Sequence, residues 1–177
     1  MAGLDPAIQS RLEGRCSSRL SLWIDMADKP FQRVGAISNA HAGADFETLA
    51  RDFFMQTENL RLTQNFDVLV GAHDHKKHRR FDLGCNEPPT LVECKSHKWT
   101  SGNNIPSAKI TVWNESMYYF HLAPPECRKV LFVLKDVRAS KSETLAAYYV
   151  RNYGHLVPRA VEIWEYDLVG NLGARIH

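Results

Sequence analysis

The chain has 177 residues, a length that suffices for one domain with a sizeable hydrophobic core. Hydrophobic residues make up 44% and charged residues 24% of the sequence, which is ordinary for a folded soluble protein. The net charge of +2 neither indicates nor excludes a nucleic-acid binder, because phosphate backbones are bound by local clusters of Lys and Arg rather than by total charge.

The cysteine pattern and the hydropathy exclude several further classes. The four cysteines form no CxxC pair and match no zinc ribbon or finger, so we expect reduced, structural thiols at Cys16, Cys85, Cys94 and Cys127. No apolar run approaches the ~20 residues that a membrane span needs. The N-terminus lacks the basic-then-apolar order of a signal peptide. We therefore expect a cytoplasmic, soluble protein with no membrane partner.

The first part of the chain is expected to be helical. Residues 5–27 carry a partial apolar stripe, and residues 28–43 are typical of a connecting segment. An amphipathic helix is predicted over 43–60, with Asp45 able to cap its start. The apolar residues at helical spacing in this segment are Phe46, Leu49, Ala50, Phe53 and Phe54.

Three strands are predicted next. Residues 60–71 form the first, with an interruption near Gln64–Asn65, and residues 79–85 form the second after a polar loop at 72–78. A turn that contains two prolines leads into the third strand, at 90–99. Because these connections are too short for crossovers, the three strands are expected to form an antiparallel meander.

Helices and strands alternate in the second half. A helix is predicted over 107–123, a strand with a continuous apolar run over 128–137, a helix over 141–155 that ends at Gly154, and a final strand over 160–168. The helical links require at least one parallel crossover. The predicted fold is therefore α/β, with a mixed sheet flanked by helices.

Charged residues interrupt the third predicted strand. Side chains two apart on a strand share a face, so Glu93, Lys95 and His97 are expected to point the same way. Asp82 lies on the preceding strand, and a short hairpin would bring the two carboxylates together. Two close carboxylates repel each other unless a proton or a cation intervenes, and oxygen ligands of this kind suit Mg²⁺ or Mn²⁺. A lysine beside them can orient or activate an attacking water, which is the equipment for phosphodiester hydrolysis.

Asp82, ten intervening residues and then Glu93-Cys94-Lys95 resemble the D-(x)n-(D/E)-x-K motif of the PD-(D/E)XK nuclease superfamily. Phe81 stands where many members have Pro. The predicted element order over residues 43–135 also resembles that superfamily's αβββαβ core. We therefore expect a restriction endonuclease-like domain over 43–177, with an additional C-terminal helix and strand, and an N-terminal segment, 1–42, packed on it.

The resemblance implies a role for each residue that matches the motif. Asp82 and Glu93 would hold Mg²⁺, together with the backbone carbonyl of Cys94, and Lys95 would activate water or stabilise charge. Many members add an acidic residue from the first core helix, for which Glu47 is the match and Asp45 and Asp52 are alternatives. The resemblance also favours DNA as the substrate and allows a homodimer.

Basic and aromatic residues around this motif are candidates for contact with nucleic acid. Trp113 could stack on a base, although its spacing with neighbouring apolar residues favours the core. Residues expected to contact phosphates or bases are Lys76, Lys77, Arg79, Arg80, Lys98, Lys109 and Asn114.

Three other interpretations stay open from the sequence. Alternating Glu and Lys also occur on exposed sheet faces, where they pair across strands. The same fold could serve without catalysis, as a module that binds nucleic acid or a protein partner. A third is a zinc site in the loop that contains His73, His75 and His78.

Overall fold

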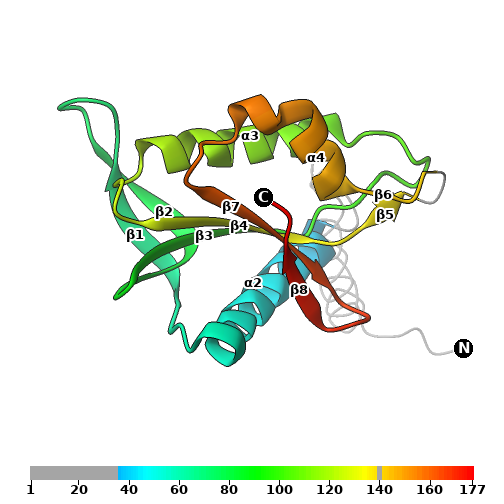
Figure 1. Ribbon diagram of the computed structural model, residues 1–177, viewed down its shortest axis with the longest axis horizontal. Coiled ribbons are helices and arrows are strands. Elements are labelled where there is room, and N and C mark those ends of the chain that lie inside the picture. Colours follow the sequence, from blue (N-terminus) through cyan, green and yellow to red (C-terminus); the bar gives the residue numbers. More distant parts are fainter. Residues whose placement is uncertain (1–35, 139–140) are drawn as a thin grey trace, which may run out of the picture. The chain divides into compact units, whose positions relative to one another are not determined.

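The computed structural model describes residues 36–138 and 141–177 (Figure 1). The helix predicted over 5–27 and most of the segment 1–42 lie outside the described residues. Residues Ser38–His177 form one compact unit. None of the described helices has the length and apolar character that crossing a membrane requires.

A six-stranded mixed sheet forms the centre of this unit, in the order β1-β2-β3-β4-β7-β8. The first three strands pair antiparallel, β4 and β7 continue the sheet in parallel, and β8 returns antiparallel to β7. The strands are β1 (Thr63–Val70), β2 (Lys77–Asn86), β3 (Pro89–Lys95), β4 (Arg128–Leu134), β7 (Val161–Asp167) and β8 (Leu172–Arg175). The predicted antiparallel meander and the parallel crossover are both confirmed.

Helices cover both faces of the sheet. In Figure 1, α2 (Ala36–Glu58) lies on one side, and α3 (Ser107–Leu122) and α4 (Leu145–Tyr153) lie on the other. A short 3-10 turn, η1 (Gly154–Leu156), follows α4. The two-residue strands β5 (Val137–Arg138) and β6 (Glu143–Thr144) form a separate ribbon before α4. The prediction of a mixed sheet flanked by helices is thus confirmed at the level of fold class.

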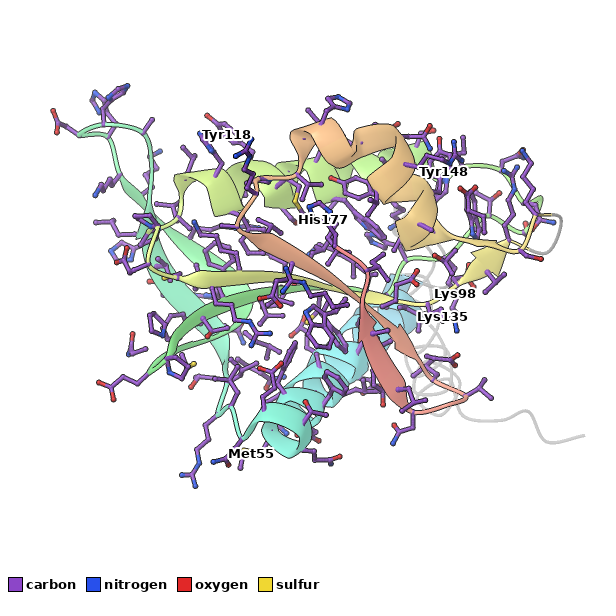
Figure 2. All side chains as sticks on the ribbon, in the orientation of Figure 1. Met55, Lys98, Tyr118, Lys135, Tyr148 and His177 are labelled. Atoms are coloured by element: carbon purple, nitrogen blue, oxygen red, sulfur yellow. The ribbon has the colours of Figure 1, made fainter. Side chains whose placement is uncertain are left out.

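The core has two layers, one on each face of the sheet, and alternation along the strands supplies both. On β3, Leu91 packs in the layer under α3 and α4, whereas its neighbour Val92 packs in the layer under α2. The apolar run of β4 does the same, with Leu131 on one face and Phe132 on the other. Figure 2 shows side chains between the sheet and the helices on both sides.

Trp113 belongs to this core. It is fully buried on α3, one turn from Ile110 and Met117, and its ring meets Tyr149 of α4 at 5.0 Å between centroids. Because the indole has no exposed face, stacking on a base is ruled out in this structure. The helical spacing that favoured a core role is confirmed.

Several predicted boundaries were wrong. Helix α2 begins at Ala36, within the segment predicted to be a connection, so Asp45 lies inside the helix and does not cap it. The glycine does not end the helix: Gly43 has no positive φ, and a single glycine inside a helix costs only about 1 kcal/mol relative to Ala. Helix α4 begins at Leu145 rather than near 141, because the Thr144 hydroxyl accepts from Ala147 N–H at 3.0 Å and caps it.

Two strands differ from the prediction, and the interruption of a third is as predicted. Strand β3 ends at Lys95, so His97 follows the strand rather than lying in it. Strand β8 was not predicted, because its four residues, LGAR, are few and include Gly and Ala, which are depleted in strands. The predicted interruption of the first strand is confirmed: Asn65 has φ 55°, and the pairs with β2 pass from Gln64 directly to Phe66.

Candidate active site

The site lies where β2 and β3 separate. Their antiparallel pairing runs from Asn86↔Pro89 to Leu83↔Val92 and stops there, one residue before Asp82 and Glu93. Past that point Cys94 is no longer paired with β2, and its N–H donates to Asp82 Oδ2 at 2.7 Å. The Asp82 carboxylate thus satisfies a backbone donor that the diverging strands leave free.

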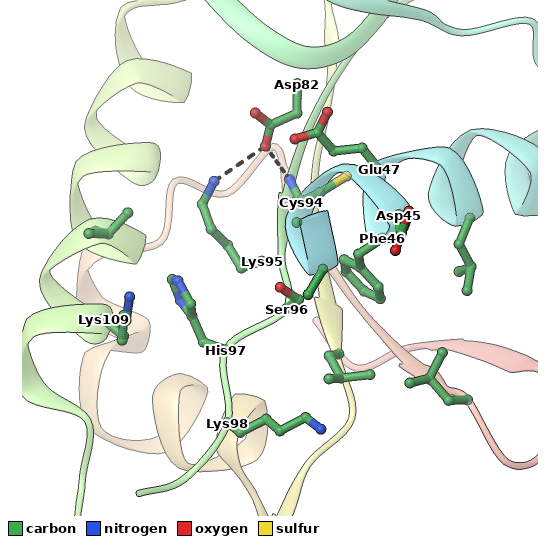
Figure 3. Close-up of a pocket in the computed structure, with 16 residues that line it drawn as sticks. Asp45, Phe46, Glu47, Asp82, Cys94, Lys95, Ser96, His97, Lys98 and Lys109 are labelled. Atoms are coloured by element: carbon green, nitrogen blue, oxygen red, sulfur yellow. Dashed lines mark hydrogen bonds and ion pairs between the residues drawn. The ribbon is translucent and has the colours of Figure 1, made fainter. Parts of the chain in front are cut away.

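Lys95 bridges the two carboxylates of the motif. Its Nζ lies 2.6 Å from Glu93 Oε2 and 3.4 Å from Asp82 Oδ2 (Figure 3 shows the Asp82 contact). Both carboxylates therefore lie within reach of a single cation, as the sequence pattern predicted. Glu93 and Lys95, two apart on β3, also share a face of the sheet as expected.

Glu93 is held on all sides by donors. Its side chain is only 2% exposed. Besides the contact with Lys95, it accepts a hydrogen bond from Arg79 Nη2 at 3.2 Å and one from the Ser116 hydroxyl of α3 at 3.4 Å. A buried carboxylate needs such partners, because an unpaired charge in the interior costs several kcal/mol. Arg79 and Ser116 as partners of Glu93 were not expected from the sequence, since neither lies at a strand or motif spacing from it.

A third carboxylate approaches from α2. Glu47 projects towards Asp82 in Figure 3, and both residues line the same pocket. Burial, and after it the charge of Asp82, raises the pKa of Glu47 above its usual value. Of the alternatives, Asp45 is exposed at the same pocket, and Asp52 is exposed and lies outside it.

The protonation of the neighbouring groups follows from the same charges. Burial alone would lower the pKa of Lys95, but the carboxylates of Glu93 and Asp82 outweigh it and raise that pKa above the usual value. Lys95 is therefore an ammonium at neutral pH. Burial raises the pKa of Cys94 well above the usual range, so its sulfur stays a thiol, and only its backbone carbonyl remains as a ligand.

Glu47, Asp82, Cys94 and Lys95 line a pocket of about 770 Å³ with two unlike walls, whereas Glu93 is buried and does not line it. The carboxylates of Glu47 and Asp82 form one wall, and the other carries His97 and Lys109, with Lys95 between them (Figure 3). The remaining residues that line the pocket are Ala42, Gly43, Asp45, Phe46, Leu49, Cys94, Ser96, Lys98, Val112, Leu134 and Leu168. We call the second wall the basic wall, because Lys109 gives it a positive charge; an acidic wall beside it suits a cation and a phosphate bound side by side.

The residues predicted to contact nucleic acid separate into two places. Lys98 and Lys109 line the main pocket, both exposed. Lys76, Lys77 and Arg80 line a second groove of about 530 Å³ between the β1–β2 hairpin and the end of α3. Of these residues, only Lys98 and Lys109 therefore lie in the same pocket as the carboxylates.

Two of the predicted contact residues are engaged within the protein. Arg79 also lines the second groove, but its guanidinium pairs with Glu93 and lies over the Tyr119 ring at 4.1 Å from the centroid. Asn114 Oδ1 accepts from the Tyr149 hydroxyl at 3.0 Å and so ties α3 to α4, away from the main pocket.

Over residues 36–138 and 141–177, no three His, Cys, Asp or Glu side chains gather as a ready-made metal-ligand set. In the loop for which the sequence left a zinc site as an alternative, His73 and His75 are exposed, and His78 pairs with Asp67 at 2.9 Å. At the carboxylates, the ammonium of Lys95 takes the position between Asp82 and Glu93.

Comparisons with protein-family models, with curated proteins and with solved structures give no match to this chain.

Proposed function

We propose that this protein is a metal-dependent nuclease of the PD-(D/E)XK type that hydrolyses phosphodiester bonds, with DNA as the expected substrate. One observation carries the proposal: carboxylates from two diverging strands share one cation position, at the edge of a pocket with a third carboxylate and a basic wall. Solvated Glu and Lys residues on an exposed sheet face would not be buried as Glu93 is.

The residues present fit a divalent cation. The raised pKa of Glu47 reflects burial and an excess of negative charge beside Asp82, which a hard cation would relieve. Asp82, Glu93 and Glu47 would supply carboxylate oxygens, and Cys94 its carbonyl, which are the ligands that Mg²⁺ and Mn²⁺ prefer. A cation held there supplies positive charge at the scissile phosphate and favours the deprotonation of an attacking water.

Lys95 has the second role. Because its pKa is raised, it acts in this state as a fixed positive charge rather than as a base. When a metal takes the position between the carboxylates, the Lys95 Nζ would move from there into the pocket, where it could orient a water and stabilise negative charge that develops on the phosphate. Ser116 and Arg79 keep Glu93 in place and thereby position Lys95.

A cleavage assay tests the proposal. Plasmid DNA, linear DNA and RNA are incubated with the protein in Mg²⁺, in Mn²⁺ or in EDTA, next to Asp82→Asn, Lys95→Ala and the control Asp52→Asn. Asp52→Asn is the control because it makes the same substitution as Asp82→Asn, on the helix that carries Glu47 but outside the pocket. We expect metal-dependent cleavage that falls by about a thousandfold or more in the first two variants and is unchanged in the control. Equal cleavage by Lys95→Ala would refute the assigned role.

One observation favours the non-catalytic alternative, a binding module on the same scaffold. Lys95 and Arg79 both pair with Glu93, so the carboxylate is neutralised without any metal. Such a module would bind nucleic acid with equal affinity in EDTA and in Mg²⁺, and would give no product with any substrate. Fluorescence anisotropy with a labelled oligonucleotide, run beside the cleavage assay, distinguishes the two functions.

A further inference from the structure

His97 makes a hydrogen bond that determines which of its nitrogens carries the proton. Its Nδ1 lies 2.8 Å from Nε1 of Trp113, the fully buried indole of α3. An indole N–H can only donate, so Nδ1 must be the acceptor and must be unprotonated. In a neutral imidazole the remaining proton then resides on Nε2.

The surroundings of His97 also disfavour its charged form. Burial, and then the positive charges of Lys109 and Lys95, lower the pKa of His97 to about 4. The other charged groups that line the same pocket are Asp45, Glu47, Asp82 and Lys98. A proton on Nδ1 would in addition place two donors, His97 and Trp113, against each other. His97 is therefore neutral at physiological pH, with a fixed tautomer.

The Nε2–H of this tautomer is available to a ligand. His97 lines the main pocket, and in the part of the chain that the structure describes Nε2 has no hydrogen-bond partner. In Figure 3, His97 lies beside Lys109 on the wall that faces Glu47 and Asp82. Lys109 is exposed, and the described residues offer it no ion pair. A neutral donor and a free cation thus stand next to each other, across the pocket from the carboxylates.

We propose that His97 and Lys109 form a phosphate-binding subsite, in which His97 donates from Nε2 to a phosphate oxygen of the nucleic acid and Lys109 supplies the charge. This deepens the proposed function and rests on it for the identity of the substrate. His97 acts as a positioning residue with a fixed N–H, and takes no part as an acid or a base. The ligand class is a phosphate monoester or diester, because the pair combines one directional donor with one mobile cation.

Histidine NMR and inorganic phosphate test the subsite without any cleavage assay. In EDTA, the ¹⁵N shifts of His97 should report the Nε2–H tautomer at every pH from 8 down to 5. Phosphate should shift the Nε2 resonance in a saturable manner. A neutral hydrogen bond contributes several-fold to affinity, so we expect His97→Asn to weaken phosphate binding about three- to tenfold. Lys109→Met should weaken it by at least as much, and Lys141→Met, an exposed lysine outside the pocket, should leave it unchanged.

The variants separate the proposed role from simple packing on Trp113. In His97→Asn, the amide oxygen of the new side chain stands close to the position of Nδ1 and can accept from the indole, whereas His97→Gln places an amide donor near the position of Nε2. Recovery of phosphate binding in His97→Gln but not in His97→Asn supports the subsite. An Nδ1–H tautomer, titration of His97 near pH 6.5, or phosphate shifts that do not reach His97 would overturn it. These results are independent of nuclease activity: an inactive protein that binds phosphate in this way refutes the proposed function and leaves the subsite standing.

Discussion

Removing the ammonium between the two carboxylates is the sharpest perturbation of this site. Lys95→Met retains most of the side-chain volume and deletes the charge that lies 2.6 Å from Glu93 and 3.4 Å from Asp82. The Lys95 side chain is 11% exposed and that of Glu93 is 2% exposed, so solvent screens the pair only slightly. Removing one partner of such a buried pair costs about 3–5 kcal/mol.

Arg79 and Ser116 still serve Glu93 in this variant, which places the expected loss at the lower end, about 3 kcal/mol. For a chain of this length each kcal/mol lowers Tm by about 2–4 °C, so the variant should melt about 6–12 °C below the wild type in EDTA. Mg²⁺ should then stabilise the variant more than the wild type, because the cation no longer meets the ammonium at the carboxylates.

Thermal unfolding by circular dichroism, in EDTA and over a series of Mg²⁺ concentrations, measures both effects. The matched control is Lys98→Met, a lysine that lines the same pocket but is exposed and makes no ion pair within the described residues. Its Tm should stay close to that of the wild type. Equal melting of Lys95→Met and the wild type in EDTA, or equal stabilisation of both by Mg²⁺, would refute the reasoning that Lys95 occupies the cation position.

Three further predictions concern the stability of the fold. The neutral form of His97 is favoured in the folded protein, with a pKa of about 4 against 6.5 for the free side chain, so its contribution is present above pH 6.5 and is lost as the pH falls towards 4. After a discount for partial exposure this amounts to about 1–2 kcal/mol. Urea unfolding at pH 7 and pH 4 should therefore show a larger loss of stability, by about this amount, in the wild type than in His97→Asn. Glu47→Gln removes a carboxylate whose pKa is raised, so in EDTA at pH 7 it should increase the free energy of unfolding by about 0.5–1 kcal/mol and raise Tm. The same variant should abolish cleavage. A lower Tm would contradict the repulsion between Glu47 and Asp82. Arg128 pairs with Glu58 of α2 and Glu162 of β7. Arg128→Ala should therefore lower the free energy of unfolding in urea by about 2–3 kcal/mol without changing cleavage per folded molecule. A loss below about 0.5 kcal/mol would show that solvent already screens these pairs.

The local elements of this chain follow from its sequence. The spacing of Ile110, Trp113 and Met117 predicted α3, and the apolar run at 128–137 predicted a strand covered on both faces, of which 128–134 form β4. Short turns between the first three strands required an antiparallel meander. The pairing of Glu93 and Lys95 on one face followed from the two-residue repeat of a strand. Each of these depends on residues close together in the chain, which is why one sequence suffices for them.

The composition of the site was decided by the tertiary structure. The sequence favoured Glu47 and kept Asp45 and Asp52 as alternatives, and it is the packing of α2 on the sheet that turns Glu47 towards Asp82. The bonds from Arg79 to Glu93 and from Trp113 to His97 join residues 14 and 16 positions apart on different elements. The sequence by itself therefore determined most of the strands and helices of the described residues and the spacing of the motif, because periodicity is a local property. Which side chains meet depends on where two paired strands separate and on how the helices lie across the sheet, and only the folded chain specifies these.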